Sequence, residues 1–243
     1  MDTKQAPGPN DCKLKLAEHF YSLQGEGKSS GAPSVFLRLS MCNFNCSWCD
    51  TADVWKKGTW YDYDEMDALM RENNYYRRLS KGARLVVTGG DPLIQQDKLV
   101  GMFRRWSEFG QKVERMCIEV ETQGHIQPSE SFALLIRQWN VSPKLANSGM
   151  PYERRINMPV LKWHAEKNSF FKFPVTSRDE LNEVDELVRA CGVKRTRVFL
   201  MPVCSTREQH AAASLAIAEM AKLSGYNYSP RLQLVLWDKT CGV

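Results

Sequence analysis

Long apolar runs are absent from this 243-residue sequence. The longest, at residues 198–203 and 232–237, are far shorter than the roughly 20 residues that a membrane-spanning helix needs. The first eleven residues are polar and contain two prolines, without the apolar stretch of a secretory signal. We therefore expect neither a membrane segment nor export. Hydrophobic residues make up 43% of the chain, which is enough for a sizeable buried core.

A strong charge of one sign is also missing. The formal net charge of +5 comes from 33 basic and 28 acidic residues spread along the chain, so nucleic-acid binding is not expected. A small basic cluster at residues 77–84 is interpreted as a solvated helix end. The four histidines show no metal-ligand spacing, and we assign them no catalytic role.

The cysteine pattern does not suggest disulfides. Eight cysteines in a chain of this length, without a secretory signal, indicate a reducing compartment such as the cytoplasm. Five of them are scattered and are expected to be non-catalytic. The other three, Cys42, Cys46 and Cys49, form a C-x3-C-x2-C motif directly after an apolar strand.

Three thiolates in one short loop indicate a metal site. Soft sulfur ligands select zinc, Cu(I) or an iron–sulfur cluster. A structural zinc site is normally closed by four protein ligands, and an iron–sulfur cluster normally takes four cysteines. No other cysteine obviously completes the set, so a cluster held here would keep one iron open for chemistry.

Strand and helix patterns alternate along the chain. We predict strands at residues 19–22, 34–40, 84–88, 115–121, 139–141, 170–176, 197–203 and 230–237. We predict helices at residues 62–79, 95–109, 129–138, 179–191 and 206–223, and an irregular excursion with one helical piece at residues 145–168. About six strand–helix units in a single domain, residues 1–243, indicate an α/β fold whose parallel sheet is open or rolled toward a barrel.

Polar or glycine-rich turns follow several of these strands. They are the cysteine loop and residues 88–91, 121–124, 142–144 and 201–204. Because ligands bind beyond the carboxyl ends of parallel strands, we expect these turns to share one site. Arg38 interrupts an otherwise apolar strand, and a buried cation needs an anionic partner or a ligand unless it lies at the solvent end.

Two motifs resemble those of the radical S-adenosylmethionine (SAM) enzymes. One is the cysteine triad with Trp48 before its third cysteine, and the other is the stretch Gly89 to Pro92, which resembles the GGEP element with aspartate in place of glutamate. Over almost the whole chain the sequence is similar to the 7-carboxy-7-deazaguanine synthase family. The segments that carry this resemblance are residues 22–27, 38–39, 49–51, 88–90, 121–124, 142–144 and 230–232, with Trp237 and residues 242–243.

The resemblance implies a partial parallel β/α barrel of the radical SAM type and a set of site residues. Cys42, Cys46 and Cys49 are implied to hold a 4Fe–4S cluster, and Thr51 to ligate a Mg2+ ion that touches the substrate carboxylate. The residues implied to bind SAM are Trp48, Cys49, Asp50, Gly90, Ser142, Pro143, Lys144, Met201, Pro202, Val203 and Cys204. Those implied to bind the substrate are Leu23, Gln24, Gly25, Arg38, Thr88 and Val243, and Arg38 is implied to pair with the substrate carboxylate.

The reaction implied by the resemblance converts 6-carboxy-5,6,7,8-tetrahydropterin to 7-carboxy-7-deazaguanine, a step in queuosine biosynthesis. It is a radical ring contraction with loss of ammonia, started by an electron from a reduced flavodoxin-like donor, with SAM as a cofactor. The protein mainly positions and shields the radical, and no side chain is assigned as acid or base. A homodimer is the family expectation.

Two other interpretations stay open from the residues. A glycyl-radical activating enzyme shares the cysteine spacing and SAM cleavage but acts on a protein backbone. The turn at residues 23–27 and Arg38 favour a small carboxylated substrate instead. A zinc or iron–sulfur module with a purely structural role predicts four protein ligands.

Overall fold

The computed structural model describes residues 12–240 and 242 of the chain. Its strands are β1 (Lys13–Leu23), β2 (Pro33–Leu39), β3 (Thr59–Asp62), β4 (Arg84–Gly89), β5 (Ile118–Thr122), β6 (Gln138–Val141), β7 (Ser169–Val175), β8 (Val198–Pro202) and β9 (Asn227–Tyr228). Its α-helices are α1 (Ala52–Trp55), α2 (Tyr63–Glu72), α3 (Tyr75–Ser80), α4 (Gln96–Glu108), α5 (Glu130–Ala133), α6 (Tyr152–Arg155), α7 (Met158–Glu166), α8 (Leu181–Cys191), α9 (Arg207–Ser224) and α10 (Leu232–Trp237). Short 3-10 turns lie at Gly27–Ser29, Pro92–Gln95, Val113–Arg115, Ala146–Ser148, Arg178–Glu180 and Arg195–Arg197.

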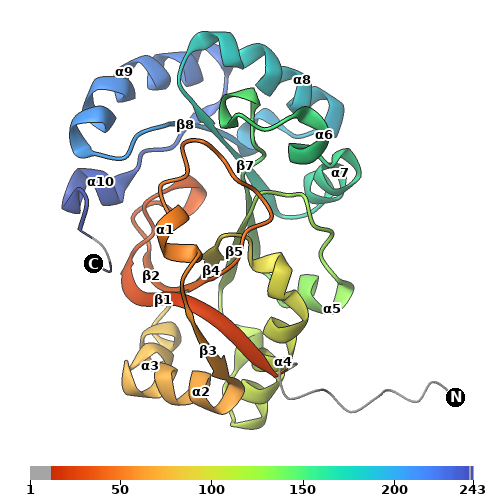
Figure 1. Cartoon of the computed structure of the whole chain (residues 1–243), viewed down its shortest axis with the longest axis vertical. Helices are drawn as coiled ribbons and strands as arrows, with labels where there is room; N and C mark the ends of the chain where they lie inside the picture. The colour runs from red at the N-terminus through yellow and green to blue at the C-terminus, as the bar shows by residue number, and fades with distance from the viewer. Residues whose placement is uncertain (1–11, 241, 243) are drawn as a thin grey trace, which may run out of the picture.

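The strands form one open sheet in the order β3-β1-β2-β4-β5-β6-β7-β8-β9. From β2 to β9 every neighbouring pair is parallel. Strand β1 pairs antiparallel with both β2 and β3. Figure 1 shows the longer helices arranged around the outside of the curved sheet. The predicted α/β class with a mostly parallel sheet is confirmed.

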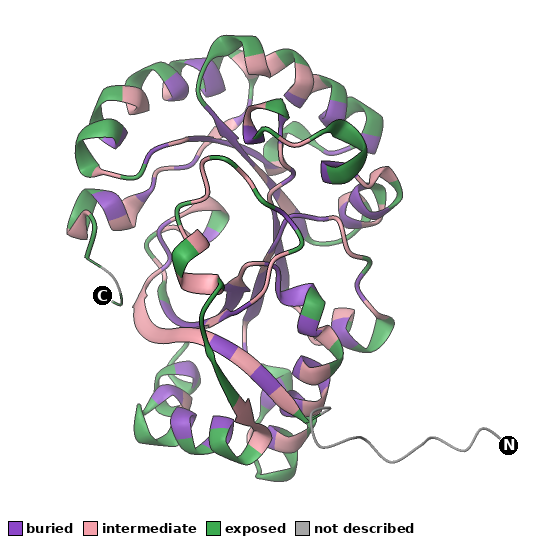
Figure 2. Cartoon of the chain, viewed as in Figure 1, coloured by how far each residue is buried: buried purple, intermediate pink, exposed green. Residues whose placement is uncertain are grey.

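The core lies between the sheet and the outer helices. The four middle residues of the central strand β4 are buried, as expected where both faces of a parallel sheet are covered. On α4 the buried residues Leu99, Met102, Phe103 and Trp106 recur at helical spacing, so this face of the helix packs on the sheet. Figure 2 shows buried strands at the centre and exposed outer faces on the helices.

The predicted helix at residues 62–79 is wrong in its interior, because the structure has two helices there. Its start is as expected: the Asp62 carboxylate accepts from the backbone N–H of Asp64 and Glu65 in a capping box. The break comes at Asn74, whose backbone is left-handed with φ of 57°. Helix α2 therefore ends before this turn and α3 begins after it.

The predicted last strand, residues 230–237, is also wrong, because most of this run is helix α10. A short apolar run fits a buried strand and a short helix equally well, and tertiary contacts decide between them. Here the Leu232 N–H donates to the Gly25 carbonyl at 2.9 Å, which holds the segment against the β1–β2 connection. The sheet ends instead at the two-residue strand β9.

Smaller corrections concern the strand count and the loops. The strand expected at residues 19–22 is the end of the longer β1, and of the nine strands in the described residues β3 and β9 were not expected. The strand expected from residue 115 begins at β5, after a 3-10 turn, and the helix expected at residues 129–138 is the single turn α5. The excursion at residues 145–168 contains two helices, α6 and α7, rather than one.

Two sequence expectations about charge and redox state can be compared with the fold. The basic cluster is only partly a solvated helix end, because Arg84 belongs to β4 and pairs with the buried Glu119. Every cysteine in the described ranges is a free thiol. No helix of the described chain is long and apolar enough to cross a membrane.

Candidate active site

A cavity of about 570 Å3 opens at the carboxyl ends of the parallel strands. As predicted, the cysteine loop and the turns after β4, β5, β6 and β8 all line it. Every site residue named from the sequence lines this cavity, except Pro143 and Val243. Pro143 is not among the lining residues, and Val243 lies outside the described residues.

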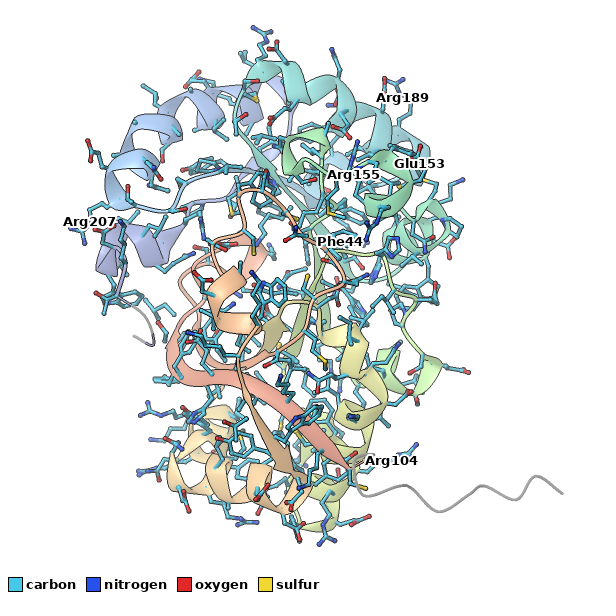
Figure 3. All side chains as sticks on the ribbon, in the orientation of Figure 1. Phe44, Arg104, Glu153, Arg155, Arg189 and Arg207 are labelled. Atoms are coloured by element: carbon cyan, nitrogen blue, oxygen red, sulfur yellow. The ribbon has the colours of Figure 1, made fainter. Side chains whose placement is uncertain are left out.

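The cysteine loop, residues 42–49, presents its three thiols to this cavity. The Phe44 N–H donates to Cys42 Sγ at 3.4 Å, and Trp55 Nε1 donates to Cys49 Sγ at 3.5 Å. Phe44 is labelled near the centre of Figure 3. Burial raises the pKa of Cys42 to about 11 and also raises the pKa of Cys46, so metal binding must release protons from these thiols.

These thiols do not form a closed site for a single ion. Within the described part of the chain, no three His, Cys, Asp or Glu side chains are arranged to hold one metal ion. Three soft donors that face one cavity fit a cluster with several irons, one of them without a protein ligand.

The excursion after β6 holds the cysteine loop in place. The Ser47 N–H donates to the Ser148 carbonyl at 3.0 Å, and Trp48 Nε1 donates to Asn147 Oδ1 at 3.2 Å. Asn147 Nδ2 in turn donates to the Pro174 carbonyl at 3.1 Å, at the end of β7. This gives residues 146–148 a role that was not apparent in the sequence, as a clamp between the cysteine loop and the sheet.

Lys144 places a cation beside the three thiols. Its Nζ donates to Ser142 Oγ at 3.1 Å and lies 5.5 Å from the centroid of the Trp48 ring. Burial lowers the pKa of Lys144, whereas the charges of nearby thiolates favour its protonated form. The ammonium group is therefore best stabilised when the cysteines are deprotonated, as they are when they bind a metal.

Two glycines allow the end of β4 to lie directly against the cysteine loop. A Cβ on Gly89 would lie 2.1 Å from the Leu39 carbonyl oxygen, and one on Gly90 would lie 2.0 Å from the Met41 carbonyl oxygen. The close approach lets the Asp91 N–H donate to that Met41 oxygen at 3.0 Å. The glycines are required for backbone contact at this point.

Asp91 stands where the related motif has glutamate, and its side chain is hydrogen-bonded within the protein. Its buried carboxylate accepts from the Leu93 N–H at 3.0 Å, from Thr122 Oγ1 at 2.8 Å and from the Gln123 N–H at 3.2 Å. Burial raises the pKa of Asp91, although these donors oppose the shift. The short side chain thus joins the ends of β4 and β5, and the Gln123 side chain continues to Cys42, whose Sγ lies 3.8 Å from Gln123 Oε1.

The opposite half of the cavity presents polar groups around Glu121. Gln24 Nε2 donates to Glu121 Oε1 at 3.1 Å, and Thr88 Oγ1 donates to Glu121 Oε2 at 2.7 Å. Arg38 also reaches this wall, where its Nε donates to Glu18 Oε1 at 2.7 Å across the β1–β2 pair. Glu18 is therefore one anionic partner of Arg38, bound through Nε, whereas the implied pairing with a substrate carboxylate stays a prediction.

A buried cluster of charged residues joins the cysteine side of the cavity to the Glu121 side. Of its members, only Asp50 was predicted from the sequence as a site residue. Glu26 pairs with Lys172, and its Oε1 accepts from Arg231 Nε at 3.0 Å and from Gln233 Nε2 at 2.8 Å. Arg231 also pairs with Asp50. Burial alone would raise the pKa of Glu26, but the two cations outweigh it and lower that pKa. Glu26 and Arg231 stand inside motifs that the sequence singles out, but only the fold shows that they meet.

Comparisons with known proteins agree with this arrangement. Residues 23–168 match a family model described as a 4Fe-4S single cluster domain. A 7-carboxy-7-deazaguanine synthase from Pyrobaculum aerophilum is 33% identical over 232 residues, which cover 95% of this chain and 97% of that protein. Another, from Rhodopirellula baltica, is 32% identical over 240 residues, covering 93% of this chain and 87% of that protein.

A solved structure shares the fold. The crystal structure of QueE from Escherichia coli superposes with a TM-score of 0.64 at 24% identity, covering 89% of this chain and 93% of that chain. The curated relatives match far beyond the cysteine loop, which favours a small-molecule enzyme over an activating enzyme or an inert scaffold. The chain belongs to the 7-carboxy-7-deazaguanine synthase family of radical SAM enzymes.

Proposed function

We propose that this protein converts 6-carboxy-tetrahydropterin to 7-carboxy-7-deazaguanine by a radical ring contraction that releases ammonia. The observation that carries the proposal is that one cavity contains both the cysteine triad and a wall of charged and amide side chains. Its volume of about 570 Å3 lies within the range of small-molecule sites. The family of the curated relatives supports the same reaction.

On the cofactor side, Cys42, Cys46 and Cys49 would hold a 4Fe–4S cluster, which supplies the electron for reductive cleavage of SAM when it is bound. The SAM molecule would contact the backbone at Gly90 and the turns at residues 142–144 and 201–204. The Thr51 hydroxyl, on the same loop, offers the hard oxygen ligand that Mg2+ prefers. The chain itself orients these groups through the Asn147 clamp and the Asp91 bridge.

On the substrate side, the wall matches a carboxylated heterocycle with several N–H groups. Arg38 can form charge-assisted hydrogen bonds with the substrate carboxylate. Glu121, held by Gln24 and Thr88, can accept from ring N–H donors. Aromatic side chains complete the cavity lining and keep water from a reactive intermediate. They are Phe20, Phe36, Phe44, Trp48 and Trp55.

The proposal extends to partners by family resemblance. A reduced flavodoxin-like protein would deliver the electron, and the enzyme would act as a cytoplasmic homodimer in queuosine biosynthesis. A role for Leu23 and Gly25 in binding the substrate through their backbone groups is part of the same proposal, since both line the cavity.

Product analysis by mass spectrometry tests the proposed reaction. Protein reconstituted anaerobically with iron and sulfide is incubated with SAM, Mg2+, dithionite and 6-carboxy-tetrahydropterin. We expect the reconstituted protein to show the visible absorbance of an iron–sulfur cluster. We also expect it to convert the pterin to 7-carboxy-7-deazaguanine. A reconstituted protein that cleaves SAM but never forms this product would refute the proposed substrate.

Two substitutions test the proposed cofactor side and the proposed substrate side of the cavity. Cys46→Ala is expected to abolish the cluster absorbance, and an unchanged spectrum would contradict the ligand assignment. Arg38→Ala is expected to lower kcat/KM for the pterin at least tenfold, because it removes a charge-assisted contact worth about 1.5–3 kcal/mol. Arg105→Ala is the matched control, since Arg105 pairs with Asp64 on the outer surface.

A further inference from the structure

The C-terminal strap, residues 229–238, joins the edge strand β9 to a connection that lies near the other end of the sheet order. It follows the edge strand β9, yet it is bonded to the connection between β1 and β2. The Gly27 N–H donates to Ser229 Oγ at 2.7 Å, and the Leu232 N–H donates to the Gly25 carbonyl at 2.9 Å. Figure 1 shows α10, the helix of this strap, beside the β1–β2 side of the molecule.

Arg231 is a buried residue of the strap that lines the cavity. Its Nε donates to Glu26, one terminal nitrogen donates to the Asp50 carboxylate, and the other donates to the Cys204 carbonyl. Its backbone N–H donates to His210 Nε2 at 3.2 Å. The guanidinium group is largely buried and bound through all three nitrogens, so its contacts hold protein segments together.

The three acceptors belong to different parts of the site. Asp50 lies between the cluster ligand Cys49 and Thr51, and Cys204 ends the turn after β8, on the cofactor side. Glu26 lies in the turn that carries Gln24 and borders the substrate side. A planar guanidinium fixes the directions of its acceptors, which a lysine ammonium does not.

We propose that Arg231 is a positioning residue that fixes the cofactor half of the cavity relative to the substrate half, so that SAM cleavage stays coupled to turnover of the substrate. The proposal rests on the reaction proposed above. A shift of about 1 Å between reacting groups can cost on the order of 100-fold in rate. If the substrate is displaced in this way, SAM can still be cleaved, but the cleavage does not lead to product.

The test measures 5′-deoxyadenosine and 7-carboxy-7-deazaguanine formed by the reconstituted enzyme with SAM and the pterin. For Arg231→Met we expect the cluster spectrum to persist, product formation to fall about 100-fold, and 5′-deoxyadenosine per product to rise at least tenfold. Arg231→Lys keeps the charge without the fork geometry, and we expect an intermediate ratio. A ratio equal to that of the wild type in both variants overturns the proposal.

Two controls separate positioning from general destabilisation. Arg84→Met removes another partly buried arginine from its ion pair with Glu119, outside the cavity lining, so it should lower stability and leave the ratio unchanged. An equal rise in Arg84→Met would overturn the proposal. Asp50→Asn combined with Arg231→Met should raise the ratio no further than Arg231→Met alone, because that change already removes the contact with Asp50.

A measurement without turnover distinguishes this inference from the proposed function. The double-mutant cycle of Arg231→Met and Asp50→Asn, followed by urea unfolding of the metal-free protein, reports the link between strap and cysteine loop. We expect the two changes to be non-additive, and additive effects would show that the link is absent. A wild-type enzyme that forms no product would refute the proposed function while this cycle still decides the contact.

Discussion

Replacing Gly90 by alanine gives the sharpest test of how the cofactor side is assembled. The new Cβ would lie 2.0 Å from the Met41 carbonyl oxygen and 2.7 Å from Cys42 Cβ. An ordinary carbon–oxygen contact is about 3.3 Å, so the two loops must separate by roughly 1 Å. The atoms in the way are mostly backbone, and a change of side-chain rotamer cannot relieve the contact.

The cost of this separation follows from the contacts it breaks. The Gly90 N–H donates to the Leu39 carbonyl at 3.3 Å, and the Asp91 N–H donates to the Met41 carbonyl at 3.0 Å. Losing both costs about 1 kcal/mol each, and the overpacking adds about 1–3 kcal/mol. A total of about 3–5 kcal/mol corresponds to a fall in Tm of about 10 °C for a protein of this size.

Thermal unfolding of the metal-free protein, followed by iron analysis after reconstitution, measures both consequences. We expect Gly90→Ala to lower the Tm and to reduce the bound iron, because Cys42 moves with the displaced loop. Gly110→Ala is the control, since its φ of 83° carries about 1–2 kcal/mol of strain but no atom obstructs its Cβ. A Gly90→Ala protein as stable as Gly110→Ala, with a full complement of iron, would refute the reasoning.

Three further predictions concern other parts of the molecule. Burial lowers the pKa of His164 from 6.5 to about 3, so the stability that its neutral form provides is present above pH 6.5 and falls by about 2 kcal/mol by pH 5. Urea unfolding of His164→Phe should show a correspondingly flatter pH dependence, and equal slopes would contradict this. Asn147→Ala releases Trp48 and should speed the loss of cluster absorbance to a chelator several-fold. The metal-free protein should lose only about 2 kcal/mol of stability, about 1 kcal/mol for each of the two hydrogen bonds of Asn147. Thr51→Val should raise the Mg2+ concentration for half-maximal turnover at least tenfold with an unchanged cluster spectrum. Thr51→Ser keeps the hydroxyl and should leave that concentration close to the wild-type value.

Local patterns in the sequence were sufficient for the outline of the fold. The alternation of strands and helices predicted the α/β class and the parallel sheet, which in turn placed the turns after β4, β5, β6 and β8 at one edge. The prediction that they share a cavity with the cysteine loop is confirmed. That prediction follows from the topology alone, because the carboxyl ends of parallel strands lie at the same edge of the sheet.

Short elements were predicted less well. The break at Asn74 and the helical state of residues 232–237 were missed because several conformations fit the same local pattern. The direction of β1 was not specified either, since the local pattern of a strand does not tell whether its neighbours run parallel or antiparallel to it. Contacts with distant segments select among these possibilities.

By itself, the sequence determined the number and spacing of the cysteines, the glycines at the end of β4 and the alternation of strands and helices that brings them to one edge of a parallel sheet. Only the tertiary structure decided which charges meet. Arg38 pairs with Glu18 on the neighbouring strand, whereas Glu26 and Arg231 approach each other across 205 positions of the chain. The residue types that can ligate a metal and the glycines that free the backbone are visible in short stretches of sequence. The partner of a buried charge depends instead on which distant segments the whole fold brings together.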